Sequence, residues 1–111
     1  MTSPKRDSNC TLAELKQVVD DFVRQRTWQK FHNAKNLSMA LAVEAAELME
    51  HYQWLTTEQV TSGEGYDLAD VTDELADITS YVLALANVLD IDLSSAVANK
   101  MVKNRLKYPL N

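Results

Sequence analysis

The sequence predicts a small all-α domain, and three observations support this fold class. The chain has 111 residues, which is enough for one domain with a single core. It contains only 2 Gly and 2 Pro, too few for the many turns of an all-β fold. Apolar residues also recur at helical spacing through most of the chain. We therefore predict four main helices within residues 11–109, after a disordered lead-in over residues 1–10.

The first two main helices each start near a residue that can cap a helix. Thr11 and Glu14 have the spacing of a capping box, which opens a helix that continues to about Arg26. The side chain of Asn36 can cap the next helix, which we place over residues 36–55. The connector between them, residues 27–35, carries an unusual concentration of aromatic side chains for a loop.

The third main helix follows a short helical turn and a break. Thr56 and Gln59 form a second capping box, for a short helix that ends at the Ser62–Gly65 segment. Residues 66–90 then carry apolar side chains every three or four positions, which predicts the longest helix of the chain.

Asp92 caps the last main helix, which ends near Lys107 because Pro109 cannot continue it. Cations near the end of a helix complement the helix dipole, and this ordinary role stays open for most of its basic residues. Lys100 and Asn104 lie one turn apart on this helix, so they can reach together toward phosphate oxygens.

Acidic residues interrupt the apolar stripe of the helix predicted over residues 36–55. At about 100° per residue, Glu44 falls inside the stripe and Glu47 lies at its edge, whereas Glu50 points away. A carboxylate on a core-facing surface is costly unless it is paired, hydrogen-bonded or bound to a metal. Pairing of Glu44 with a Lys or Arg remains an alternative to a metal.

A second acidic pair borders the apolar stripe of the helix over residues 66–90. Glu74 and Asp77 are one turn apart at the edge of this stripe, whereas Asp73 points to the opposite side. If the two helices face each other, the two pairs bring four carboxylates into one pocket. Hard oxygen donors of this kind suit Mg²⁺, or Mn²⁺, better than zinc or copper.

Charge and cysteine content restrict the partners and the compartment. The formal net charge is -5, which argues against binding to a nucleic-acid polymer or an anionic membrane. Cys10 is the only cysteine, so no internal disulfide is expected. No apolar run reaches the length of a membrane span, and the first residues lack the apolar stretch of a signal peptide. We expect a cytoplasmic protein.

Five motifs in a fixed order give the sequence a family resemblance. They are RxWxxFHxxxNL over residues 26–37, ExxE over 44–47, HYQW over 51–54, ExxD over 74–77 and KMxxNRxxYP over 100–109. An ExxE followed by an ExxD is a weak signal alone, because acids at helical spacing are common. All five together resemble the MazG-like nucleotide pyrophosphohydrolases, with the dCTP pyrophosphatase branch as the nearest match.

The resemblance implies an all-α enzyme that hydrolyses (deoxy)nucleoside triphosphates, dCTP-like deoxynucleotides first, to monophosphate and pyrophosphate, and clears unwanted triphosphates from the nucleotide pool. It implies a homo-oligomer, with a tetramer built as a dimer of dimers. The implied Mg²⁺ ligands are Glu44, Glu47, Glu74 and Asp77, and the implied substrate-binding residues are Trp28, His32, Trp54, Tyr81, Lys100, Asn104 and Tyr108. Some relatives carry a His where this chain has Val19, which removes an expected polar contact to the base.

The catalytic roles within this set are only partly assigned by the sequence. Glu47, at the edge of the cluster, is the most plausible group to accept a proton from the attacking water, but the pattern does not separate a base from a ligand among the four acids. Lys100 and Asn104 are the residues expected to contact the triphosphate during the reaction.

Two other classes compete with this interpretation. A ferritin-like di-iron bundle also joins carboxylates on facing helices, but it needs paired ExxH motifs that this chain lacks. A non-enzymatic helical interaction module is the main alternative, although such a module has no need of an acid within a core-facing stripe. Stabilisation by Mg²⁺ or Mn²⁺ separates an enzyme of the predicted kind from such a module.

Overall fold

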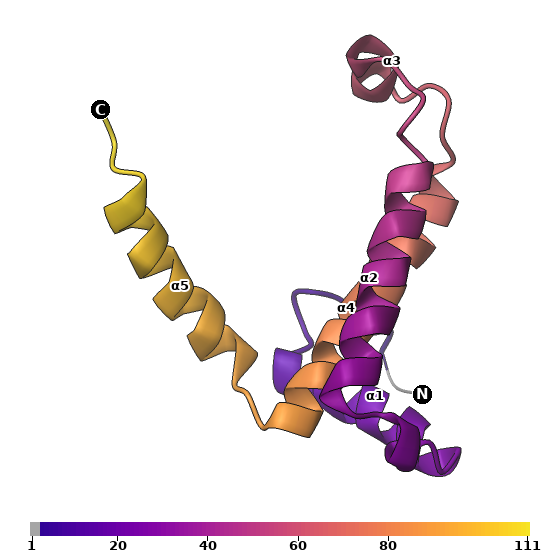
Figure 1. Cartoon of the computed structure of the whole chain (residues 1–111), viewed down its shortest axis with the longest axis vertical. Coiled ribbons are helices and arrows are strands. Elements are labelled where there is room, and N and C mark those ends of the chain that lie inside the picture. Colours follow the sequence, from indigo (N-terminus) through magenta and orange to yellow (C-terminus); the bar gives the residue numbers. More distant parts are fainter. Residues whose placement is uncertain (1–2) are drawn as a thin grey trace.

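A computed structural model describes residues 3–111, and these residues form helices, turns and loops without a strand. Figure 1 shows a group of helices packed together and a last helix that leaves them. The all-α class predicted from the sequence is confirmed. Residues 1–2 of the expected disordered lead-in lie outside the described residues. Within residues 3–10, the Asn9 N–H donates to the Arg6 carbonyl in a turn (3.0 Å).

Helix α1 spans Leu12–Gln25 and begins with the predicted capping box. The Glu14 N–H donates to Thr11 Oγ1 at 3.1 Å, and the Thr11 N–H donates to Glu14 Oε1 at 3.3 Å. These two bonds satisfy amide groups that have no partner inside the helix. The helix ends at the expected place and buries Val23 against the rest of the chain.

The aromatic connector turns back against α1 instead of leaving it. Thr27 has a left-handed backbone (φ 56°), and the next N–H, that of Trp28, donates to the Val23 carbonyl at 3.0 Å. This is a common way to end a helix, although the left-handed position usually holds Gly. The turn brings the Trp28 ring edge-on to Phe22, with 5.6 Å between ring centroids, before the short 3₁₀ helix η1 (Gln29–Phe31).

Helix α2 spans Ala34–Glu50, so it begins and ends earlier than predicted. The expected cap, Asn36, is wrong, because Asn33 Oδ1 accepts the Asn36 N–H at 2.9 Å and so caps the helix. The Asn36 side chain instead donates to the Phe31 carbonyl at 3.0 Å and ties the connector to the helix. At the other end, turns over residues 51–54 follow the helix and lead to the extended Thr56, which caps the next helix.

The short helix α3 spans Thr57–Ser62, and its capping box, Thr56 with Gln59, is the predicted one. Gly63 ends it with a left-handed backbone (φ 80°), and Gly65 repeats this conformation (φ 83°). A Cβ atom at Gly65 would lie 2.6 Å from Cδ2 of Leu55. The left-handed backbone therefore favours Gly at position 65, and any larger residue there would also require the Leu55 side chain to shift.

Helix α4 spans Leu68–Leu89, and Asp67 caps it by accepting the Ala69 N–H at 2.8 Å. Tyr66, which we expected inside this helix, packs its ring on Tyr52 instead, with 5.0 Å between centroids. Figure 1 shows α4 running beside α2, and α1 crossing near the C-terminal end of α4. The core is formed where α4 meets α1 and α2, by Val23, Leu37, Val71, Leu83, Ala84 and Ala86.

Part of the α4 stripe is not covered by the chain itself. Leu68, Leu75 and Leu89 belong to the apolar stripe that the sequence places toward the core, yet all three are exposed, and Leu75 keeps 51% of its surface accessible. The physical reason is that α1 and α2 together cover only one side of a helix that is apolar on a broader arc.

Helix α5 spans Leu93–Lys107 and is capped by Asp92, as predicted, whose Oδ1 accepts the Ser95 N–H at 3.0 Å. It leaves α4 at an angle of 101° and points away from α1, α2 and α4 (Figure 1). Most of its side chains are exposed, including the apolar Val97, Met101 and Val102. Within one chain, therefore, the fourth main helix does not pack into the bundle.

Residues 3–111 hold no single helix that is both long enough and apolar enough to cross a membrane; only α4 and α5 taken as one bent pair reach that length and composition.

Candidate functional site

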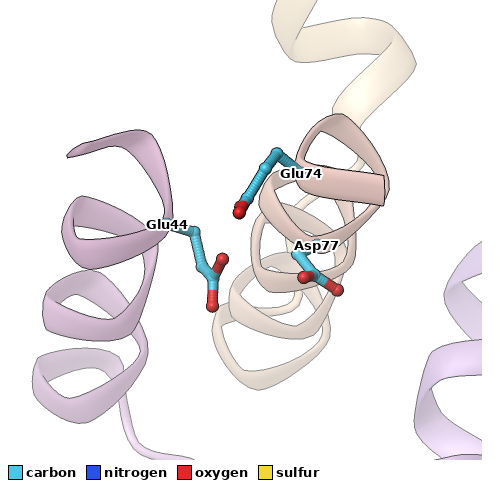
Figure 2. A group of neighbouring side chains, drawn as sticks. All are labelled: Glu44, Glu74 and Asp77. Atoms are coloured by element: carbon cyan, nitrogen blue, oxygen red, sulfur yellow. The ribbon is translucent and has the colours of Figure 1, made fainter. Parts of the chain in front are cut away.

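Three acidic side chains meet where α2 packs on α4. One carboxylate oxygen each from Glu44, Glu74 and Asp77 lies within 4.8 Å of the others. Figure 2 shows Glu44 reaching from α2 toward α4, where Glu74 and Asp77 project from successive turns. The convergence predicted from the two helical stripes is present for these three acids.

The positions of these acids follow from the helical repeat. Glu44 occurs seven residues after the buried Leu37, so it faces α4 with the rest of that stripe. Glu74 follows the buried Val71 by three residues and so lies near the buried side of α4, and Asp77, one turn later, lies at the edge of that side. The packing of the two apolar stripes therefore brings the carboxylates together.

Glu47 lies beside this cluster without being one of the three closest acids. It is half-buried, one turn after Glu44 on α2, and the Glu44 carboxyl raises its pKa. Glu50 and Asp73, the two acids that the helical wheel directs to solvent, are both exposed. Asp77 is exposed as well, so it differs from Glu50 and Asp73 by lying in the acidic cluster, as the helical wheel predicts, and not by its burial.

The cluster leaves carboxylate oxygens buried without partners. Oε2 of Glu44 and Oε2 of Glu74 are both inaccessible and accept no hydrogen bond. Removing such an oxygen from water without a replacement partner is costly. Two such oxygens, together with the nearby carboxylate of the exposed Asp77, form the kind of donor set that a hard divalent cation prefers, so the residues fit Mg²⁺ or Mn²⁺.

The electrostatics of the cluster agree with a site for a cation. Desolvation raises the pKa of the Glu44 carboxyl, and the close approach of Glu74 raises it further. Both effects disfavour the charged form of an acid that lacks a counter-charge. A bound cation reverses this balance, because it stabilises the ionised carboxylates.

A pocket of about 490 Å³ adjoins the acids and contains the aromatic residues of the connector. Glu44 and Asp77 line it, together with three predicted substrate-binding residues, Trp28, His32 and Tyr81. The Trp28 and His32 rings are 6.5 Å apart and inclined by 30°. An acidic wall and an aromatic wall therefore share one cavity of a size that accommodates a small organic molecule.

The pocket also includes residues that the sequence reasoning did not propose, namely Val18, Phe22, Val23, Ser80 and Ala84. Helical spacing from residues already considered could have indicated two of them. Phe22 is three residues after Val19 on α1, and Ser80 is three residues after Asp77 on α4. Ser80 donates its hydroxyl to the Ala76 carbonyl at 2.8 Å, so its Oγ faces the pocket as an acceptor only.

Four predicted substrate-binding residues are not brought to this pocket by the chain that carries it. Trp54 follows α2 and keeps 86% of its surface exposed. Lys100, Asn104 and Tyr108 lie on or just after α5, which points away from the acids (Figure 1). The Asn104 amide approaches only the Met101 sulfur, at 3.9 Å.

Comparison with known proteins gives consistent matches. The sequence model of the MazG-like family matches residues 39–111. The chain is 36% identical over 106 residues to dCTP pyrophosphatase 1 of Bos taurus, which covers 94% of this chain and 63% of that protein. It is 36% identical over 102 residues to dCTP pyrophosphatase 1 of Homo sapiens, a match that covers 89% of this chain and 59% of that protein. The chain thus spans about three-fifths of the curated relatives it matches.

A solved structure extends the similarity to the whole fold. The crystal structure of a pyrophosphatase from Archaeoglobus fulgidus superposes with a TM-score of 0.84 at 32% identity. The match covers 99% of this chain and 100% of that one.

Proposed function

The chain belongs to the MazG-like family, and from this premise we propose that it is a Mg²⁺-dependent nucleoside triphosphate pyrophosphohydrolase. It hydrolyses (deoxy)nucleoside triphosphates to the monophosphate and pyrophosphate, favours dCTP-like deoxynucleotides, and clears unwanted triphosphates from the nucleotide pool. The observation that carries the proposal is that the acids Glu44 and Asp77 and the aromatic residues Trp28 and Tyr81 line the same pocket.

The acidic wall is the proposed metal site. Glu44, Glu74 and Asp77 hold Mg²⁺ or Mn²⁺, with Glu47 beside them, and the two orphaned oxygens support this assignment. When bound, the ion supplies charge neutralisation and Lewis-acid polarisation of the phosphate oxygens. The carboxylates orient the ion, and their helices hold them in place through the buried stripe between α2 and α4.

Glu47 is the proposed proton acceptor. It lies one turn from Glu44 at the edge of the cluster, where a water approaching the substrate can reach it. Glu47 takes a proton from this water while the water oxygen bonds to phosphorus and the bond between the α- and β-phosphates breaks. The leaving group is pyrophosphate.

The aromatic wall is the proposed base site. Stacking of a base on Trp28, with His32 and Tyr81 nearby, contributes about 1–3 kcal/mol and depends little on which base is bound. The α1 wall, Val18, Val19, Phe22 and Val23, offers no hydrogen-bonding side chain. We therefore propose a preference for deoxyribose, from crowding at the sugar, and only modest selectivity among bases.

Completion of the site by another copy of the chain is the proposed reason for oligomer formation. Among the described residues, no Lys or Arg lines the pocket, although a triphosphate carries several negative charges. The cation expected to contact it, Lys100, lies with Asn104 on α5, which leaves its own bundle. A homotetramer, built as a dimer of dimers, can supply α5 and cover the exposed apolar residues of α4.

A direct assay tests this function. The protein is incubated with each canonical and modified deoxynucleoside triphosphate in the presence of Mg²⁺, and the released phosphate species are identified. The expected product is pyrophosphate, with faster turnover of deoxynucleotides than of ribonucleotides. Release of orthophosphate, or equal turnover of ribonucleotides, contradicts the proposed reaction or the proposed sugar preference while leaving the metal site in place.

A further inference from the structure

His51 is the one basic side chain that the structure places against the acidic cluster. Its Nε2 atom lies 3.9 Å from Oε1 of Glu74, and both side chains are mostly covered, with 25% and 18% of their surfaces exposed. Within residues 3–111, no Lys or Arg nitrogen comes within 4.0 Å of Glu44, Glu47, Glu74 or Asp77. On the helical wheel His51 lies near Glu44 and Glu47, which suits a group that supports the acids without being a ligand itself.

The position of His51 follows from the end of α2. It is the residue at which the helix ends, and its N–H still donates to the Leu48 carbonyl at 3.2 Å. It follows Glu47 by four residues and Glu44 by seven, so its side chain leaves α2 on the same side as both acids. The imidazole thus reaches across to α4 one turn beyond the acids of α2.

The two oxygens of Glu74 have different surroundings. Oε1 faces His51, whereas Oε2 is buried without a hydrogen-bond partner, and Glu74 supplies one of the three clustered carboxylates. At 3.9 Å the contact is longer than a direct hydrogen bond. The imidazole therefore restrains the carboxylate through electrostatic attraction and steric contact. Because the imidazole occupies the space beside Oε1, it limits the directions in which the Glu74 carboxylate can turn.

We propose that His51 is a positioning residue that fixes the Glu74 carboxylate toward the cation site. The inference rests on the proposed function, because it takes the acidic cluster to be a metal site. Residues that contact metal ligands in this way commonly change metal affinity or activity by about 10–100-fold when they are removed. His51 itself does not touch the substrate or the ion in this assignment.

Direct titration of the full chain with Mn²⁺, without nucleotide and with free Mn²⁺ followed by electron paramagnetic resonance, tests the proposal. His51→Ala removes the contact, whereas His51→Gln retains an N–H donor at a similar distance from the backbone. The dissociation constant is expected to rise about tenfold in His51→Ala and to return to within about threefold of the unsubstituted chain in His51→Gln. Gln53→Ala, an exposed substitution two residues further on, is the control.

A second measurement separates positioning from loss of structure. The concentration of Mg²⁺ that gives half-maximal hydrolysis should rise in His51→Ala, while the rate at saturating Mg²⁺ stays within about threefold of the unsubstituted chain. Thermal unfolding without metal shows whether each variant is folded. Equal Mn²⁺ affinity in all variants, or an equal loss in His51→Ala and His51→Gln, overturns the role of His51.

The remaining outcomes distinguish this inference from the proposed function. Failure of the unsubstituted chain to bind Mn²⁺ contradicts the metal site, and the role of His51 falls with it. Normal Mn²⁺ binding with the expected pattern among the variants, but no release of pyrophosphate from any nucleotide, upholds His51 and contradicts the proposed reaction.

Discussion

Glu44 of α2 and Glu74 of α4 face each other across the helix interface, and each buries an Oε2 atom that accepts no hydrogen bond. Two unpaired carboxylates in such proximity oppose folding in the absence of a counter-charge. The fold tolerates this cost at one place only among its described acids, next to the pocket that holds the aromatic side chains.

Replacing any of the four acids, Glu44, Glu47, Glu74 or Asp77, with Ala should reduce pyrophosphate release by about 100-fold or more, because each contributes to the metal site or accepts the proton. Initial rates with dCTP and Mg²⁺ measure the loss.

The matched controls for these four variants are Glu50→Ala and Asp73→Ala, which remove exposed acids from the same two helices. Both should keep most of the activity, within about threefold, because surface substitutions rarely disturb a site that they do not contact. Similar losses in the controls and in the four variants would show that the helical positions have no bearing on the reaction.

Glu44→Gln should stabilise the metal-free protein while it abolishes hydrolysis. The folded state raises the pKa of this carboxyl above its ordinary value of 4.5, so the native state binds the proton more strongly than the unfolded chain. The ionised carboxylate therefore costs stability at pH values above the folded pKa, and this cost disappears below pH 4.5.

The gain in melting temperature from Glu44→Gln should accordingly be larger near neutral pH than near pH 4.5. Thermal unfolding in the presence of a chelator, followed by circular dichroism at several pH values, measures it. A variant that is less stable than the unsubstituted chain at neutral pH would contradict the assignment of Glu44 as an uncompensated buried charge.

Divalent cations should raise the melting temperature of the unsubstituted protein. A ligand at about 100 times its dissociation constant stabilises the folded state by about 2.7 kcal/mol when it does not bind the unfolded chain. Differential scanning fluorimetry with Mg²⁺, Mn²⁺ or a chelator records the shift. Glu74→Ala should remove most of it, and an interaction module without a metal site should show none.

Gly65→Ala should destabilise the protein more than Gly63→Ala. Both positions have a left-handed backbone, which costs a residue with a side chain about 1–2 kcal/mol. Only at Gly65 does the new Cβ meet another side chain, Cδ2 of Leu55 at 2.6 Å, which adds about 1–3 kcal/mol of overpacking.

Urea denaturation of the two glycine variants provides the comparison. Gly63→Ala is the control, because its Cβ would meet no atom within 4 Å. Equal midpoints for the two variants would show that Leu55 moves aside without cost.

Light scattering at micromolar concentration should find a tetramer. Leu75→Glu places a charge on an exposed apolar part of α4 and should shift the protein toward smaller species, because burying an unpaired charge in an interface is costly. Glu50→Ala, on the exposed side of α2, should leave the mass unchanged. A monomer for the unsubstituted chain would remove the proposed completion of the site by a second copy.

Local features of the sequence predicted the local structure well, because each depends on residues close together in the chain. The capping boxes at Thr11 and Thr56 and the cap at Asp92 are present as expected. The position of Glu44 within an apolar stripe also predicted which way it faces, since helical periodicity fixes direction once packing buries the stripe. The acidic cluster could therefore be predicted from the sequence.

Other features depend on competition or on distant parts of the chain. Asn33 and Asn36 are both good caps, and the one chosen depends on Asn36 finding the Phe31 carbonyl for its side chain. The angle at which α5 leaves α4 is set by the left-handed Asp90 and the residues after it, and no periodic pattern encodes it. The family resemblance predicted that Lys100 and the acids belong to one site, but within a single chain α5 holds Lys100 away from the acids.

The six-residue core of the single chain has a consequence for the kinetics of folding. In the proposed assembly, the exposed apolar side chains of α4 and α5 are buried only when chains associate. Much of the favourable free energy of folding is therefore gained in the association step, which is second order in protein concentration. Refolding rates should then rise with protein concentration, and dilute chains should remain loosely packed and susceptible to proteolysis. The level of expression would thereby set how quickly newly made protein matures.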